Sequence, residues 1–233
     1  MKFLYIFLFS FIFISCRKKQ EIKLPLNDNP GIHEVWNNSR IYILMKKSGN
    51  DTLADLKLGQ TISSTHWLVA VDRRLKLKSL ISSINKILKK RHKKSIHSDG
   101  NKKAYFTYMD TLQKKVSFVD FDSIEIMPGI FNSPEYFKKY YKTEPEVNKI
   151  HIKVFPHAVV IDDSLKLREP VDKKVLLNTY LRHLVRVTNE KKNRVYLNFD
   201  KKDNFDQFLN YYTFFKNNPP PKGEISRRIF IFE

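Results

Sequence analysis

Residues Trp67 to Lys89 read WLVAVDRRLKLKSLISSINKILK, and this stretch decides the fold class. A run of β-favouring apolar residues ends at Asp72 and two arginines, and apolar residues then recur at spacings of three and four. The first pattern is typical of a strand and the second of one face of a helix. We therefore expect a strand followed directly by a helix from about Leu75 to Arg91.

A second stretch, residues 195–216, reads VYLNFDKKDNFDQFLNYYTFFK and has the same order. When Asp72 is aligned with Asp200, each aspartate follows an apolar run and precedes two basic residues. An aspartate at a strand end is common, so the helical phase is the more informative match. The aligned apolar pairs are Leu80 with Phe208, Ile81 with Leu209, Ile84 with Tyr212, and Ile87 with Phe215. We expect an internal duplication in which both helices bury the same face, with Asp203 as the N-cap of the second helix.

Short apolar runs predict the strands of both stretches and further strands around them. They are residues 40–46, 66–71, 104–109, 115–121, 149–155, 157–161, 194–199 and 227–232. A helical face at 177–187, formed by Leu177, Tyr180, Leu181, Leu184 and Val187, has no counterpart in the first half. The interleaved pattern predicts an α/β protein, with α+β as the alternative, made of two related strand-helix sheet units. The second unit is expected to be the more complete.

The predicted organisation has five parts. Residues 1–15 are a signal peptide, 16–40 a tether with Pro and Gly punctuation, and 41–126 the first α/β unit. Residues 127–147 form a connector that separates it from the second unit at 148–233.

The N-terminal sequence indicates where the protein is located in the cell. Residues 3–14 are apolar except for Ser10 and would span about 18 Å as a helix, too short for a hydrocarbon core of about 30 Å. A charged start, a short apolar run and a small residue are the parts of a secretory signal. Ser15 and Cys16, the chain's single cysteine, resemble the bacterial lipobox, where the cysteine is diacylated and the signal is cleaved before it. The alternative is a buried or membrane-core cysteine that happens to end an apolar run.

The residues after Cys16 bear on localisation. Arg17, Lys18 and Lys19 follow it directly, and this excess of basic residues after the apolar run opposes the usual orientation bias. Acidic residues at this place mark surface export in some bacterial groups, and here there are none. We expect a membrane-anchored lipoprotein of the cell envelope that faces the periplasm.

The motif VYLNFDKK (195–202), with the strand and helix order around it, resembles the periplasmic domain of the ExbD/TolR family. The resemblance covers about the last third of the chain and part of the first half. It implies a small domain that dimerises or binds envelope partners, so a homodimer is an open alternative. That family also has a transmembrane helix carrying an aspartate for proton transfer, whereas the apolar segment here is short and lacks an acidic residue. No proton-channel role is therefore implied.

Charge suggests a second kind of partner. The chain has 43 Lys and Arg against 24 Asp and Glu, a formal net charge of +19. Residues 73–94 contain ten basic residues and no acidic one. The predicted helix in this stretch therefore has one apolar face, and the rest of its surface is positively charged. Such a surface attracts anionic lipid headgroups or polymers, and export argues against nucleic acid as a partner. The candidate residues are Arg73, Arg74, Lys86, Lys90 and Lys94; a solvated helix face is the alternative.

Motifs for catalysis are absent from the sequence. It has no Gly-rich phosphate loop, no His-Glu-x-x-His and no Gly-x-Ser-x-Gly. His92, His97 and Asp99 lie close together in a basic, loop-like segment, where surface histidines are the more common interpretation than a zinc site. Asp110, Asp120 and Asp122 flank strands, where we expect solvated turn carboxylates, and Asp162 and Asp163 are expected to shape a hairpin. We expect no catalytic residue, no metal and no cofactor.

Three functions remain open. The first is a non-enzymatic, lipid-anchored envelope protein that binds or scaffolds a partner. The second is a binder of anionic envelope polymer or lipid, and the third is a hydrolase whose site is dispersed along the chain.

Overall fold

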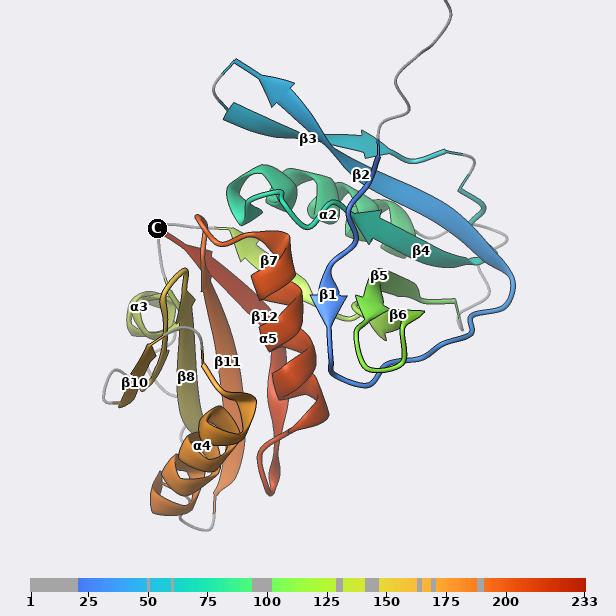
Figure 1. The fold of residues 1–233 in the computed structure, drawn as a ribbon. Coiled ribbons are helices and arrows are strands. Elements are labelled where there is room, and N and C mark those ends of the chain that lie inside the picture. The colour runs from blue at the N-terminus through green and yellow to red at the C-terminus, as the bar shows by residue number, and fades with distance from the viewer. Residues whose placement is uncertain are drawn as a thin grey trace, which may run out of the picture.

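Two six-stranded mixed sheets and four helices make up the described part of the computed structural model, so the α/β class with two similar units is confirmed (Figure 1). The described residues are 21–49, 51–59, 61–93, 102–128, 132–140, 147–162, 165–168, 171–187 and 191–233.

The first sheet has the strand order β1-β5-β4-β2-β3, with β6 paired to the other edge of β5. Strands β2, β4 and β5 are mutually parallel, while β3 and β6 are antiparallel partners of β2 and β5. The elements are β1 (Leu26–Asn27), β2 (Asn38–Ser48), β3 (Asp51–Lys57), β4 (His66–Val71), α2 (Leu77–His92), β5 (Ala104–Asp110) and β6 (Lys115–Asp120).

The second sheet has the order β10-β9-β8-β11-β12-β7. Its centre is parallel, from β8 through β11 and β12 to β7, and β9 and β10 extend it by antiparallel pairing. The elements are β7 (Glu125–Pro128), α3 (Ser133–Tyr140), β8 (Val147–Phe155), β9 (Ala158–Ile161), β10 (Leu165–Arg168), α4 (Lys173–Val187), β11 (Lys192–Asp200), α5 (Phe205–Asn217) and β12 (Gly223–Phe232).

The two sheets share one topology. The series β3-β2-β4-β5 corresponds to β9-β8-β11-β12, and α2 and α5 connect the last two strands of each series. The second unit also has α4 between its hairpin and its central strand, where the first unit has only the loop between β3 and β4. The second unit is therefore the more complete one, as predicted. Whether the repeat arose by duplication stays a prediction.

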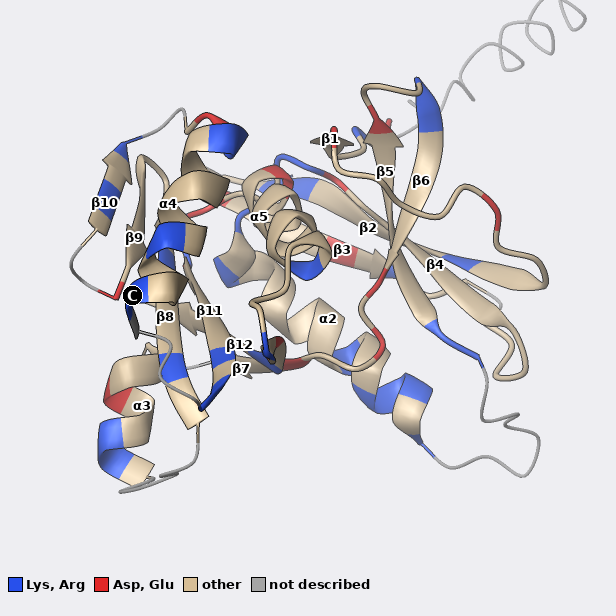
Figure 2. Cartoon of the chain, turned by 90° about the horizontal axis from the view of Figure 1, so that it is seen from below, with Lys and Arg blue, Asp and Glu red and all other residues tan. Residues whose placement is uncertain are grey.

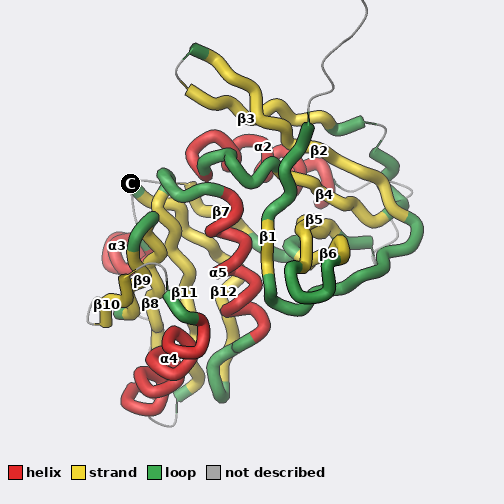
Figure 3. Tube along the Cα trace, viewed as in Figure 1, coloured by secondary structure: helices red, strands yellow, loops and turns green. Residues whose placement is uncertain are grey.

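The two connecting helices bury equivalent faces. In α2, Leu80, Ile84 and Ile87 are buried and Ile81 is partly buried; in α5, all four aligned residues are buried. Figures 1 and 3 show α2 and α5 lying between the two sheets. Each helix also contacts the other unit, because α2 touches β7 and α5 touches β1. Most buried apolar residues of both units consequently belong to one hydrophobic core, and Phe137, Tyr196 and Phe230 form a separate cluster at α3.

The two units are joined by reciprocal backbone hydrogen bonds where their strand-helix turns meet. The N–H of Leu77 donates to the carbonyl of Asp203 at 2.9 Å, and the N–H of Phe205 donates to the carbonyl of Leu75 at 2.8 Å. Leu75 aligns with Asp203 and Leu77 with Phe205, so each bond is the counterpart of the other. The two strand-helix turns at this junction are therefore related by a local twofold symmetry.

Several details differ from the expectations. The N-cap of α5 is Asn204, whose side chain accepts from the N–H of Gln207, rather than Asp203. Leu181 faces solvent in part instead of packing inside. The expected connector contains α3, and its boundary falls within β7, which pairs with β12 of the second sheet. Short strands without a strong apolar run, such as β3 and β10, were not predicted, because neighbouring strands and not their own hydrophobicity hold them.

The segment expected to be a tether is part of the fold from residue 21 onward. The buried Asn27 side chain donates to Thr213 on α5 at 2.6 Å, and Asn29 donates to the same hydroxyl at 3.1 Å. The N–H of Leu26 donates to Asp206 at 2.8 Å, and β1 pairs with β5. Side-chain amides thus fix this segment to the opposite unit, a role that composition alone does not reveal.

Candidate functional site

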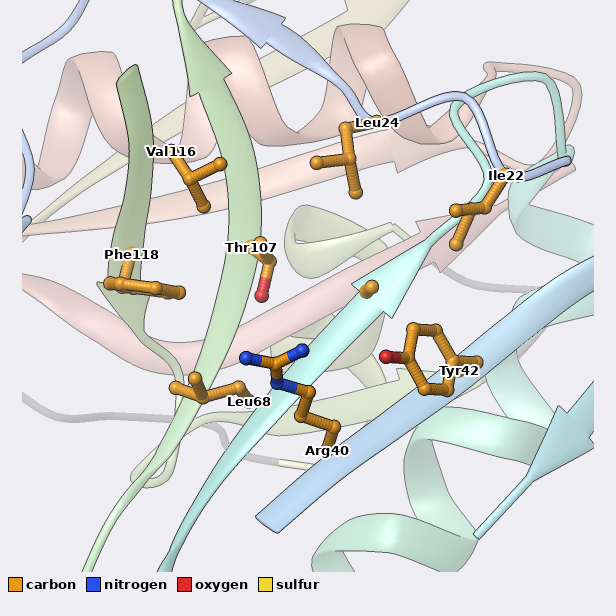
Figure 4. Close-up of a pocket in the computed structure, with 9 residues that line it drawn as sticks. Ile22, Leu24, Arg40, Tyr42, Leu68, Thr107, Val116 and Phe118 are labelled. Atoms are coloured by element: carbon orange, nitrogen blue, oxygen red, sulfur yellow. The ribbon is translucent and has the colours of Figure 1, made fainter. Parts of the chain in front are cut away.

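An apolar groove crosses the outer face of the first sheet, the face turned away from α2 and α5. Its volume is about 370 Å³, which is within the range of sites for small ligands. Figure 4 shows the lining side chains, which come from four strands and from the chain before β1. They are Ile22, Leu24, Arg40, Tyr42, Leu68, Ala70, Thr107, Val116 and Phe118.

Strand register explains why these residues meet. Tyr42 is paired with Ala70, Ala70 with Thr107, and Thr107 with Phe118, so one row runs straight across β2, β4, β5 and β6. Side chains alternate between the faces of a strand, and the residues two positions away therefore point into the same groove. The alternate residues of β2 and β4, such as Ile41 and Val69, are fully buried in the core.

Two polar side chains of β2 reach into this apolar surface. Figure 4 shows the guanidinium of Arg40 and the hydroxyl of Tyr42 pointing toward the middle of the groove. Within the described residues, Arg40 has no ion pair. Arg40 is paired in register with Leu68, so its charge lies above aliphatic groups. An arginine offers planar, paired donors that match a carboxylate or a phosphate.

The N-terminal chain forms one wall of the groove. Ile22 and Leu24 lie there because the backbone on either side is held in place. The carbonyl of Lys23 accepts from the N–H of Arg73 at 2.8 Å, and the carbonyl of Pro25 accepts from the N–H of Met109 at 2.8 Å. The wall is thus a stretch of chain without secondary structure, held near the end of β4.

The corresponding face of the second sheet is covered by a helix. The groove residues Leu68 and Ala70 align with Tyr196 and Asn198 of β11. There, Phe137 of α3 packs on Tyr196 with ring centroids 4.7 Å apart, and Asn198 accepts from the backbone N–H at the start of α3 at 2.6 Å. The chain before β8 thus forms a covering helix, whereas the chain before β2 is extended and leaves a groove.

The residues predicted from sequence lie in different places. Cys16 and Lys94 fall outside the described residues. Arg74 binds Asp72 at the start of α2, with Nε–Oδ1 and Nη2–Oδ2 distances of 2.8 and 2.6 Å. Arg73 is at the same turn, before α2 begins at Leu77. Lys90 lies about 20 Å from Leu77 along the helix axis, by the rise of about 1.5 Å per residue. Of the candidate basic residues that the structure describes, Arg73 and Arg74 therefore lie at one end of α2, and Lys86 and Lys90 lie toward the other.

The C-terminal half of α2 is strongly basic, as Figure 2 shows in blue. Lys86 and Lys90 are exposed and one turn apart. Lys90 lies 5.8 Å from the centre of the Trp67 ring and donates to Thr61, while the guanidinium of Arg91 is 5.1 Å from the same ring. Part of this charge therefore serves packing, through cation–π contacts with a buried tryptophan.

The histidines and aspartates singled out in the sequence as metal ligands or turn residues lie in different settings. His92 bonds the carbonyl of Asp122 at 2.9 Å, whereas His97 and Asp99 lie outside the described residues. Within the described ranges, no three His, Cys, Asp or Glu residues are grouped as metal ligands would be. Asp110 is buried rather than solvated, and its carboxylate accepts from the N–H groups of the β5–β6 turn.

A serine-histidine pair on the second unit bears on the hydrolase alternative. Ser133 Oγ is 2.7 Å from Nδ1 of His151, and Asp162 lies nearby. Ser133 is 0% exposed, and the carboxylate of Asp162 accepts from the backbone N–H of His151 and contacts His183 Nε2 at 2.5 Å. A nucleophile needs access to substrate and a base oriented by a third group. The geometry instead fits a buried anchor for α3.

The groove was not predicted from the sequence. A signal for it exists, because apolar residues occupy both alternations of β4 and of β6, so that part of an apolar set must lie on the outer face. In a sequence, that pattern also fits a sheet covered on both sides, as the second one is by α3.

Among the residues that the structure describes, none of the helices has the length and hydropathy of a membrane span. Comparisons with protein-family models, with curated proteins and with solved structures found no match.

Proposed function

We propose that this chain is a non-enzymatic, lipid-anchored protein of the cell envelope, and that the outer groove of its first sheet is its binding surface. The observation that carries this proposal is the position of the groove. Ile22 and Leu24 form its wall, and Cys16 is only six residues before Ile22. Six extended residues span at most about 20 Å, so a lipid on Cys16 would hold the groove close to the bilayer.

Exposed apolar residues of the N-terminal segment and of β6 with its turn support a position at a membrane surface. Trp36 is 80% exposed and Leu112, in the turn between β5 and β6, is 74% exposed. Leu26, Ile32 and Val116 are exposed to about 40%. Single exposed apolar residues are common, but these all belong to the N-terminal segment or to β6 and its turn, and Val116 lines the groove.

The resemblance to the periplasmic ExbD/TolR domain stays part of the proposal. Its basis, the order strand, strand, helix, strand, helix, strand, corresponds to β8, β9, α4, β11, α5 and β12. The small strand β10 is an addition. A protein partner on the second unit, or a homodimer, is the function that this resemblance would add.

The anchor is tested by replacing Cys16 with alanine in the full chain. We expect the wild-type protein to incorporate an alkyne fatty-acid label and to sediment with membranes, and the variant to do neither. Mass spectrometry of the mature N-terminus should show cleavage before Cys16 in the wild type. Equal labelling of the Cys16→Ala variant would overturn the anchor.

One observation favours a second candidate function, the binding of anionic lipid or polymer. Lys86 and Lys90 project from the same face of α2, with neither in an ion pair among the described residues. Two lysines one turn apart attract anionic surfaces in a salt-dependent way.

A further inference from the structure

We propose that the groove binds one single-chain anionic lipid, a long-chain fatty acid, with its acyl chain along the sheet and its carboxylate on Arg40. This deepens the proposed function and rests on it, since the anchor is what would place the groove beside a source of lipid. The occupant follows from three features of the groove: its lining, its charge and its size.

The lining favours an acyl chain. Val116 and Phe118 form one wall and the N-terminal chain the other, with Leu68 between them. Ala70 lines the groove in register with Tyr42 and Thr107. The corresponding face of the second sheet needs the aromatic residues of α3 to cover it. Burying apolar surface of this kind under an acyl chain is favourable by roughly 25 cal/mol per Å².

The charge favours an anionic head over an apolar peptide segment. Arg40 projects into the groove. None of the ion pairs found among the described residues includes it. Covering an unpaired guanidinium with an apolar segment would cost free energy, whereas a carboxylate would form paired, charge-assisted hydrogen bonds with it. The Tyr42 hydroxyl points toward the same space and offers a further donor.

The size favours one chain over two. The volume of about 370 Å³ is near the lower end of the range for small-ligand sites, so the groove suits a single acyl chain better than an intact two-chain phospholipid. The groove is open to solvent, and the head can therefore remain partly hydrated at Arg40.

The experiment uses the full chain in native membranes and a palmitate analogue with a photoreactive diazirine in mid-chain. After irradiation, we expect labelled peptides from β4, β5 or β6, and we expect unlabelled palmitate to compete. Arg40→Gln should raise the palmitate concentration needed for half-competition about tenfold or more, the effect expected for losing a charge-assisted bond. The same variant should leave competition by hexadecanol unchanged, because the alcohol carries no charge.

Two further variants complete the test. Ala70→Phe should block labelling by filling the groove, and Arg182→Gln, at an exposed arginine of α4, is the matched control that should change nothing. Circular dichroism and urea unfolding establish that each variant is folded. If Ala70→Phe does not fold, the competition measured with Arg40→Gln is the test of the proposal. Label outside the groove peptides, or equal competition by palmitate in Arg40→Gln, would overturn the proposal.

The Cys16→Ala chain separates the two proposals. If its membrane association is unchanged and the groove is still labelled, the anchor is wrong and the lipid site stands. If the anchor is confirmed and the groove is not labelled, the lipid site is wrong.

Discussion

Lys76 and Asn204, which hold equivalent positions in the two units, pair with each other in an antiparallel bridge. The bonds around this bridge come in matched pairs: the N–H of Lys78 donates to the carbonyl of Lys201 at 3.0 Å, and that of Asp206 to the carbonyl of Arg73 at 3.4 Å. Two N–H groups in the first turn of each helix are thus hydrogen-bonded across the junction. Helix starts leave N–H groups without intrahelical partners, and here each unit supplies carbonyls to the other.

The shared core predicts that the two units unfold together. Phe106 of β5 stacks on Phe121 with centroids 3.6 Å apart, and it meets Phe205 and Phe208 of α5 at 5.1 and 6.2 Å. Phe106→Ala should therefore lower the free energy of unfolding by about 3–5 kcal/mol, through lost burial and a cavity. Urea unfolding followed by circular dichroism and by tryptophan fluorescence should give one coincident transition.

The control for this change is Leu112→Ala, at a residue that is 74% exposed. Its free energy of unfolding should stay within about 0.5 kcal/mol of the wild type. Two separate transitions, with only the first unit destabilised by Phe106→Ala, would show that the units have independent cores.

Stability should fall in acid because of Asp72. Burial of this carboxyl, which is 1% exposed, acts to raise its pKa, but the bonds from Arg74 and from backbone N–H groups outweigh it, so the pKa lies below its usual value. The unfolded value is about 3.9. A lowered folded-state pKa means that the stabilisation is complete above the unfolded value and is lost as pH falls through the folded value.

Asp72→Asn tests this dependence. At pH 7 the variant should be less stable by about 1–3 kcal/mol, the range for losing a charged hydrogen-bond partner. The difference from the wild type should shrink below about pH 4. Asp206→Asn is the control, and its stability relative to the wild type should change with pH in the opposite direction. Burial raises the pKa of Asp206, so its ionisation destabilises the folded state as pH rises, and the variant lacks this effect. A difference for Asp72→Asn that is constant from pH 7 to pH 3 would contradict the lowered pKa.

Charge reversal tests the basic face of α2. The combined change Lys86→Glu, Lys90→Glu and Lys94→Glu should weaken binding to vesicles containing anionic phosphatidylglycerol, and the wild-type binding should itself weaken as salt rises. Cosedimentation at two salt concentrations measures both. The control reverses Lys166, Lys192 and Lys222, which are exposed on the second unit. Unchanged binding of the α2 variant would mean that this face is merely solvated.

The sequence predicted much of the fold because local patterns matched tertiary demands. The β4-Asp72-α2 and β11-Asp200-α5 units were both found, since a strand with a continuous apolar run needs a cover and the next helix supplies it. The strands missed, such as β3 and β10, have mixed polarity and depend on their partners. Helix α3 was missed because residues 133–140 are few and include a proline near the start, a composition that also fits a loop.

By itself the sequence determined which residues form the two strand-helix units and which face of each helix is apolar, because hydrophobic periodicity is a local property of the chain. It also determined the expectation of a lipid anchor at Cys16, which depends on a short contiguous motif. Only the tertiary structure decided that the two units share one core through reciprocal bonds, and that Arg40, Leu68 and Phe118 lie along one groove. Such proximity depends on strand register and on long-range pairing, which bring together residues far apart in the chain.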